Sequence, residues 1–114
     1  HIEIQIGNIG SRDGCYMYLK KHKCIFLNEN LNEYDKYLVM AHELGHAILH
    51  PKENCYFIRN KTLLLNSKTE LEANKFAVEL LISDEFLEEN KRYTIEQLSR
   101  MTGYHQKLIE LRLN

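Results

Sequence analysis

The chain has 114 residues, of which 44% are hydrophobic and 27% are charged, a balance typical of a soluble globular domain. The net charge of −1 lacks the basic excess of a dedicated nucleic-acid-binding protein. No apolar run reaches the ~20 residues that a membrane helix needs. We therefore expect residues 1–114 to form a single domain that binds no membrane and makes no direct contact with nucleic acid.

The cysteines exclude two further classes of protein. There are three of them, Cys15, Cys24 and Cys55, and no two have the CxxC spacing of a thiolate metal site. An odd number is also not a disulfide framework. Reduced thiols, together with the lack of a visible signal peptide, favour a cytoplasmic protein.

The first thirty residues carry the patterns of β-strands. Residues 2–6 alternate apolar and polar side chains, the period of a half-buried strand. A Gly-, Asn- and Ser-containing turn region covers residues 7–14. Two short apolar runs follow, at 15–19 and 24–27, and the basic tip between them indicates a hairpin. These patterns predict a small, mostly antiparallel N-terminal sheet.

Helical patterns occupy the rest of the chain. Apolar residues recur at helical spacing from about Glu33 to Leu49, and Pro51 ends this helix. A second helix begins at Ser67-Lys68-Thr69-Glu70, which has the form of a capping box. Further helix starts and breaks are marked by Ser83-Asp84, by Thr94 and by Gly103, which divides the short helical segment 94–114. The expected fold class is α+β, a sheet followed by packed helices.

The first of these helices carries the run His42-Glu43-Leu44-Gly45-His46. Residues four apart lie on one face of a helix, so both imidazoles can reach one metal ion. Glu43 points about 100° away around the helix axis, where its carboxylate can contact a water molecule without being a ligand. The run matches the H-E-x-x-H pattern of zinc peptidases, which predicts metal ligands at His42 and His46 and a base at Glu43.

A catalytic zinc ion usually has three protein ligands and one open position for water. The best candidate for the third ligand is Glu70, because Asn74, four residues later on the same face, can hydrogen-bond a ligand histidine. Two alternatives stay open. Glu70 could instead complete the capping box with Ser67, and Glu72 could be the ligand if the helix is rotated.

His50 is a rival ligand, because it continues the i, i+4 series of histidines. A continuous helix carries it about 6 Å further along the axis than His46, too far for a bond of ~2 Å. We expect His50 to interact with the last free carbonyl groups of the helix instead. No site role is predicted for His1, His22 and His105.

Two longer runs resemble the ImmA/IrrE metallopeptidases. They are Ala41-His42-Glu43-Leu44-Gly45-His46-Ala47-Ile48-Leu49-His50 and Glu70-Leu71-Glu72-Ala73-Asn74-Lys75-Phe76-Ala77-Val78-Glu79-Leu80-Leu81. The strand at 25–28 and the ending at 98–103 are also similar, so the resemblance extends from about Tyr16 to Leu111. Pairing both motifs at this separation is far more specific than H-E-x-x-H alone.

The resemblance implies a zincin-like fold with the H-E-x-x-H helix at its centre. It implies that His42, His46 and Glu70 bind Zn²⁺, with Mn²⁺ as the alternative metal, and that Glu43 is the base. Family members belong to bacteria and to their phages or mobile elements, and they cleave a cognate helix-turn-helix repressor. This chain has Asn74 where related zincins commonly have Asp, and a neutral amide raises the basicity of its histidine partner less.

The strand from Cys24 to Asn28 directly precedes the motif helix. If it lies at the sheet edge, an extended substrate could pair with it as an added strand. Two other functions stay open at this stage. The chain could bind a repressor as a metal-stabilised module without cleaving it, or bind DNA through the helical segment 94–114, whose basic residues are Arg100, Lys107 and Arg112.

Overall fold

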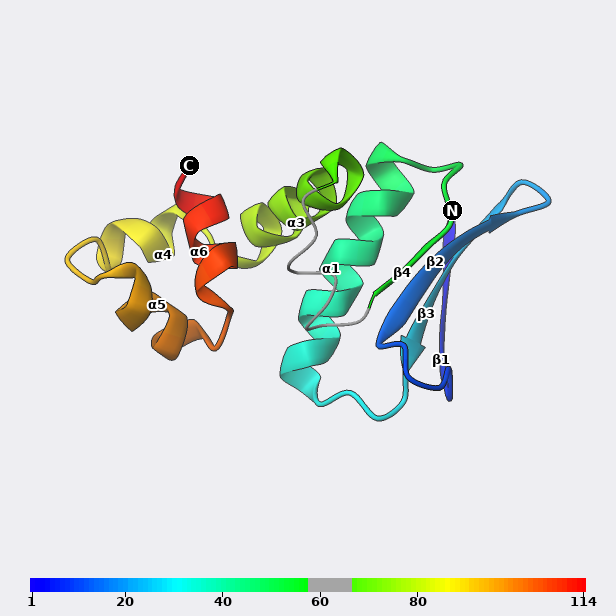
Figure 1. Cartoon of the computed structure of the whole chain (residues 1–114), viewed down its shortest axis with the longest axis horizontal. Helices are drawn as coiled ribbons and strands as arrows, with labels where there is room; N and C mark the ends of the chain where they lie inside the picture. The colour runs from blue at the N-terminus through cyan, green and yellow to red at the C-terminus, as the bar shows by residue number, and fades with distance from the viewer. Residues whose placement is uncertain (58–66) are drawn as a thin grey trace.

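The structure is a computed structural model of the chain, and it describes residues 1–57 and 67–114. Its elements in chain order are β1 (Ile2–Gly7), β2 (Gly14–Leu19), β3 (His22–Asn28), α1 (Glu33–Leu49), β4 (Cys55–Phe57), α3 (Lys68–Leu81), α4 (Asp84–Glu89), α5 (Ile95–Thr102) and α6 (Gln106–Leu113). Figure 1 shows α1 between the sheet on one side and α3 on the other, with α4, α5 and α6 at the end far from the sheet. The molecule is elongated, with extents of 48 × 26 × 24 Å.

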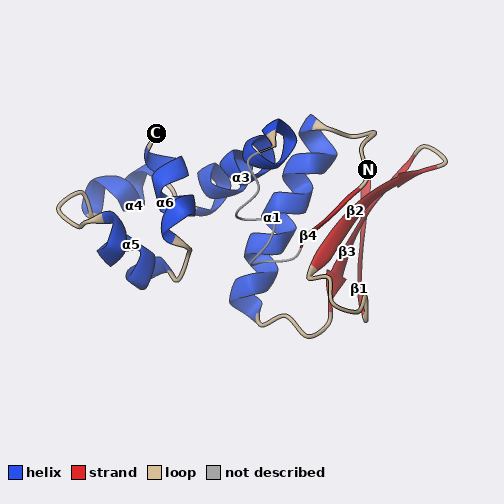
Figure 2. Ribbon diagram, in the orientation of Figure 1, coloured by secondary structure: helices blue, strands red, loops and turns tan. Residues whose placement is uncertain are grey.

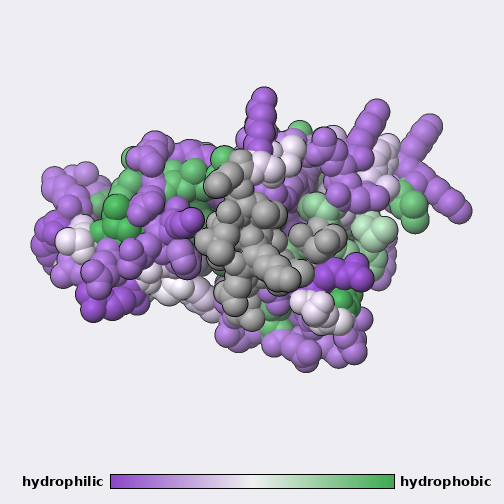
Figure 3. Space-filling view, in the orientation of Figure 1, coloured by the Kyte–Doolittle hydropathy of each residue, from purple (hydrophilic) through white to green (hydrophobic). Residues whose placement is uncertain are grey.

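The fold is α+β, as predicted (Figure 2). Among the described residues, every helix is too short or too polar to cross a membrane. The face drawn in Figure 3 is largely hydrophilic, with small apolar patches, some of them over the C-terminal helices.

The sheet has the strand order β1-β3-β2-β4 and is mixed. β2 runs antiparallel to both β3 and β4, whereas β1 runs parallel to β3. The expectation of a mostly antiparallel sheet is confirmed, with β1 as the one parallel strand among those described. The loop after β1 reverses the chain once and the tight turn at Lys20 and Lys21, both with positive φ, reverses it again, so β1 and β3 point the same way.

Two further details of the sheet differ from the sequence patterns. β4 has only three residues, too few to produce an alternation signal, and it forms by pairing with residues 14–16 of β2. β3 lies between β1 and β2, so its backbone groups are already paired and no substrate strand can add to it.

α1 has the predicted bounds, because both of its ends are determined locally. The side chain of Asn32 caps the helix by accepting the N–H of Asp35 at 2.8 Å, and the helix ends just before Pro51. One face of α1 packs on the sheet and encloses the first hydrophobic core. The buried residues of this core are Tyr16, Ile25, Leu27, Leu31, Val39, Ala47 and Phe57.

The remaining helices enclose a second hydrophobic core with the opposite side of α1. Its buried residues are Leu38, Val78, Ile82, Leu98, Tyr104, Leu108 and Ile109. The predicted helix starts are confirmed: Ser67 caps α3, Ser83 caps α4, and Thr94 forms a complete capping box with Gln97. Gly103 ends α5 with a φ of 77°, a left-handed conformation that favours glycine.

Candidate metal centre

Two small residues bring α1 and α3 together. A Cβ atom added at Gly45 would lie 3.2 Å from both the Cα atom and the carbonyl oxygen of Ala73. The two backbones can approach this closely only because one position has no side chain and the other has a methyl group. The contact sets the first turn of α3 beside the second half of α1 (Figure 1), the half that carries His42 and His46.

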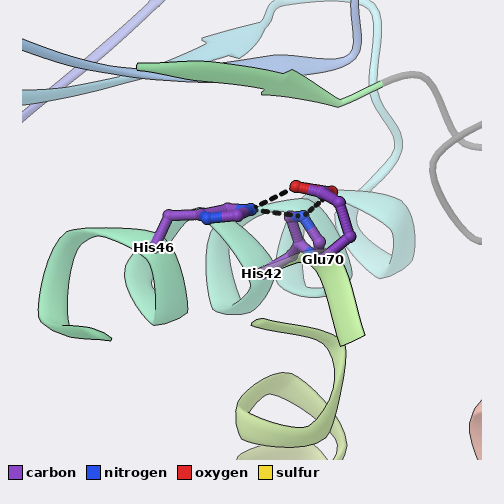
Figure 4. Close-up of side chains that lie close together, drawn as sticks. All are labelled: His42, His46 and Glu70. Carbon is purple, nitrogen blue, oxygen red and sulfur yellow. Dashed lines mark hydrogen bonds and ion pairs between the residues drawn. The ribbon is translucent and has the colours of Figure 1, made fainter. Parts of the chain in front are cut away.

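At this contact, His42, His46 and Glu70 converge (Figure 4). His46 Nε2 lies 2.7 Å from Glu70 Oε1, and His42 Nε2 lies 3.3 Å from Glu70 Oε2. The two Nε2 atoms are 3.1 Å apart. All three residues are buried, and within residues 1–57 and 67–114 they are the only group of three potential ligands with such mutual proximity.

The chemistry of these donors fits a zinc ion. Imidazole nitrogen and carboxylate oxygen bind zinc at ~2.0–2.2 Å, which in a tetrahedral site separates ligand atoms by about 3.4 Å, close to the separations found here. Burial lowers the pKa of His42, which keeps its ring neutral as a metal ligand must be. Glu70 Oε2 is buried and makes no hydrogen bond to any described residue.

Asn74 orients His42 within this group. Its Oδ1 atom lies 2.7 Å from His42 Nδ1, as the sequence spacing of Glu70 and Asn74 predicted. An amide oxygen can only accept a hydrogen bond, so Nδ1 carries the ring proton. The lone pair of Nε2 then faces His46 and Glu70. His42 is thereby held in the tautomer that binds a metal ion through Nε2.

Glu70 lies at the capped end of α3, but its side chain does not turn back onto the cap. Its backbone N–H donates to Ser67 Oγ at 3.4 Å, while its carboxylate contacts the two histidines. Burial alone would raise the pKa of this carboxyl group. The adjacent rings of His42 and His46 outweigh burial and lower the pKa to about 2, so the group is a carboxylate at neutral pH.

Glu43 lies beside this group and is fully buried. Its Oε2 accepts a hydrogen bond from the thiol of Cys55, with a Sγ···Oε2 distance of 3.3 Å. Its Oε1 has no hydrogen-bond partner among the described residues. Burial raises the pKa of Glu43 to about 8, so in the metal-free protein this carboxyl group can exchange a proton near neutral pH.

The Cys55 contact is the feature of the site that sequence patterns missed. Burial and the neighbouring charge of Glu43 raise the pKa of Cys55, so the thiol keeps its proton and acts as a donor. The other two cysteines, Cys15 and Cys24, are free thiols as well. Cys55 reaches Glu43 only because β4 pairs with β2, and nothing in its sequence context indicates that pairing.

The structure separates Glu72 from the three converging residues. Its side chain is 45% exposed, and its Oε1 lies 3.2 Å from His50 Nε2. His50 follows the last residue of α1, and its backbone N–H donates to the carbonyl of His46. Its ring contacts Glu72 and His46 rather than the free carbonyl groups, so that expectation is wrong for the side chain.

The other three histidines lie away from the site. His1 and His22 are exposed, at the chain start and at the β2–β3 hairpin. His105 caps α6 by accepting the backbone N–H of Lys107.

Comparison with known proteins places the chain in a family. The model of the IrrE N-terminal-like domain matches residues 1–114. The chain is 42% identical, over 101 residues, to immunity region protein 2 of Bacillus phage phi105; the match covers 87% of this chain and 64% of that protein. It is 41% identical over 69 residues to metallopeptidase ImmA of Bacillus subtilis strain 168, covering 60% of this chain and 40% of ImmA.

The chain thus spans less than two thirds of the length of these curated relatives. The domain match nevertheless includes every residue of the candidate centre. On this evidence, the chain belongs to the ImmA/IrrE family of metallopeptidases, the family that includes a protein of a phage immunity region.

Proposed function

We propose that this protein is a zinc-dependent endopeptidase that cleaves a cognate helix-turn-helix repressor. The observation that carries the proposal is the convergence of His42, His46 and Glu70, all buried, beside the buried carboxyl group of Glu43. Three ligands from two helices leave one coordination position for water, as catalytic zinc sites require. Structural zinc sites instead have four protein ligands.

In this proposal His42, His46 and Glu70 hold the ion, and Glu43 is the general base and acid. A bound zinc ion supplies Lewis acidity, lowering the pKa of water to about 7 and polarising the scissile carbonyl. Glu43 Oε1, which no described residue engages, takes a proton from the attacking water and delivers it to the departing amine. The thiol of Cys55 holds the other oxygen of Glu43 and keeps the carboxylate in one orientation.

The substrate strand is proposed to pair with β4. β4 pairs with β2 along one edge, and its other edge faces no strand in the described part of the chain. Cys55 on β4 contacts Glu43, so an extended peptide added along this edge passes close to the base.

The repressor as substrate is supported by the family and by the names of two relatives. One relative belongs to a phage immunity region, and the other is the metallopeptidase ImmA. The DNA-binding alternative gains no support, because Arg112, one of three basic residues in the C-terminal helices, donates to the carbonyl of Ile82 and pairs with Asp84. We place this activity in the cytoplasm. Mn²⁺ is the alternative to Zn²⁺ at the same site.

The test is to incubate the zinc-loaded protein with the purified repressor encoded beside its gene and to detect cleavage by mass spectrometry. Chelator-treated protein and Glu43→Gln are run in parallel. We expect Glu43→Gln to keep stoichiometric zinc and to cleave about 100- to 10,000-fold more slowly, the usual loss for a general base. Full cleavage by Glu43→Gln contradicts the proposed role of Glu43, whereas repressor binding without cleavage by the wild type supports the non-catalytic module.

A further inference from the structure

His46 has a second ring nitrogen, and its surroundings differ from those of His42. His46 Nδ1 lies 3.3 Å from His50 Nδ1, and His50 Nε2 lies 3.2 Å from Glu72 Oε1. The three side chains form a row from the candidate metal centre to the surface, with exposed fractions of 2%, 12% and 45%. We propose that His50 and Glu72 are positioning residues that hold the ring of His46 in its zinc-binding tautomer.

The argument follows from which atoms can donate. The carboxylate of Glu72 only accepts hydrogen bonds, so His50 places its ring proton on Nε2. With that proton on Nε2, the Nδ1 atom of His50 presents its lone pair to His46 and accepts the Nδ1–H of His46. With its proton on Nδ1, His46 presents the lone pair of Nε2 to Glu70 and His42, where the metal ion is proposed to bind.

The row is built by the same helix contact as the metal centre. His46 and His50 are four apart at the C-terminal end of α1, and Glu72 comes from the first turns of α3. The backbone N–H of His50 donates to the carbonyl of His46 at 2.8 Å, which fixes the position from which its ring extends. Packing of α3 against α1 then brings Glu72 to the far side of that ring.

The two candidate ligand histidines thus have different supports. His42 donates to the neutral amide of Asn74, which is buried, whereas His46 is linked through His50 to a carboxylate. A negative charge at the end of such a chain raises the donor strength of the ligand, which a neutral amide does less. The negative charge of Glu72 therefore acts on His46 through His50, whereas His42 has only the uncharged amide of Asn74.

This inference rests on the proposed metal centre, and zinc affinity tests it without any substrate. Zinc dissociation constants are measured by competition with a chromogenic chelator for the wild type, His50→Ala, His50→Gln and Glu72→Ala. The control is Glu79→Ala, which removes from the same helix an exposed carboxylate that pairs, among the described residues, with Lys75. Thermal unfolding of the metal-free proteins checks that each variant folds.

We expect His50→Ala to weaken zinc binding about 10- to 100-fold, the usual effect of removing a residue that orients a metal ligand. Glu72→Ala should weaken it less, because its carboxylate acts through His50. Glutamine at position 50 has an oxygen that can accept from His46 and an N–H that can donate to Glu72, so His50→Gln should recover part of the loss. Glu79→Ala should bind zinc like the wild type.

Proton and ¹⁵N NMR of the imidazole rings distinguishes a positioning role from a purely structural one. It observes the Nδ1–H of His46 directly. In the zinc-loaded wild type we expect a His46 Nδ1–H signal protected from exchange with water. In His50→Ala the signal should shift and exchange faster, although the protein remains folded.

The inference is overturned if His50→Ala and Glu72→Ala bind zinc within about twofold of the wild type and the His46 signal is unchanged. It is also overturned, together with the metal centre, if the wild type binds no zinc. A wild type that binds zinc without cleaving any repressor contradicts the proposed peptidase activity alone, and the affinities still decide the roles of His50 and Glu72.

Discussion

Two regions of the molecule bury different kinds of side chain. The contact between α1 and α3 buries polar and charged groups, whereas the C-terminal helices α4, α5 and α6 bury apolar ones. In the described part of the chain, five of the six buried polar or charged residues lie on α1 or α3: His42, Glu43, His46, Glu70 and Asn74. The buried residues of the C-terminal helices are apolar: Leu98, Leu108 and Ile109. Buried polar groups cost free energy unless they are paired or bind an ion.

This difference separates function from stability in the molecule. The α1–α3 contact holds polar side chains whose burial does not favour folding. We attribute their presence there to the proposed metal centre. The C-terminal helices pack side chains that stabilise the fold, and none of the candidate ligands among the described residues belongs to them. Substitutions at the α1–α3 contact should therefore change zinc affinity. Substitutions in the C-terminal helices should change the free energy of unfolding and leave zinc affinity unchanged.

The largest expected effect on stability is that of Leu108→Ala. Leu108 is 2% exposed in the second core, and truncating such a leucine removes about 2–5 kcal/mol from the free energy of unfolding. Urea unfolding measures this loss. Zinc affinity measured on the folded variant should match that of the wild type, and a tenfold weakening would contradict the separation of the two regions.

The pH dependence of stability is the second prediction, and it tests the buried acid of the site. Burial raises the pKa of Glu43 from its ordinary value of 4.5 to about 8, so the folded metal-free protein binds this proton more tightly than the unfolded chain. The contribution of Glu43 is therefore most favourable below pH 4.5 and is lost as the pH rises towards 8. The loss is at most about 1.4 kcal/mol per pH unit.

Urea unfolding of the metal-free wild type and Glu43→Gln at several pH values between 5 and 8 measures this contribution. Taking the difference between the two proteins cancels the titration of His42, whose pKa burial lowers. We expect Glu43→Gln to become the more stable protein, relative to wild type, as the pH increases. A difference that does not change with pH would show that Glu43 keeps its ordinary pKa.

The smallest effects come from a matched pair of glycines. Gly45→Ala gains helix propensity of about 1 kcal/mol, but its methyl group presses on the backbone of Ala73, which costs about 1–3 kcal/mol. The net change in stability should be small, while the displacement of α3 moves Glu70 and weakens zinc binding.

Gly103→Ala should behave in the opposite way. Its φ of 77° disfavours any side chain by about 1–2 kcal/mol, and a methyl group would lie 3.0 Å from the ring of Tyr34. Thermal unfolding should show the lower stability, and chelator competition should show unchanged zinc affinity. Equal effects of both variants on zinc affinity would contradict the comparison.

Much of the fold could be predicted because its signals are local. Asn32, Ser67 and Thr94 cap the helices that begin after them, and Gly103 ends α5, all through contacts within a few residues. The i, i+4 spacing also places His42 and His46 on one helical face wherever the helix packs. The direction of β1 and the existence of β4 depend on strand pairing, which local patterns do not encode.

By itself, then, the sequence determined the helices, the α+β class and the two histidines beside Glu43. Only the tertiary structure decided that Glu70 faces those histidines while Glu72 faces His50, because the rotation of α3 is set by its close contact with Gly45. It also decided that Cys55 reaches Glu43, through the pairing of β4 with β2. Both outcomes depend on residues distant in sequence, whose approach is determined by the packing of whole elements.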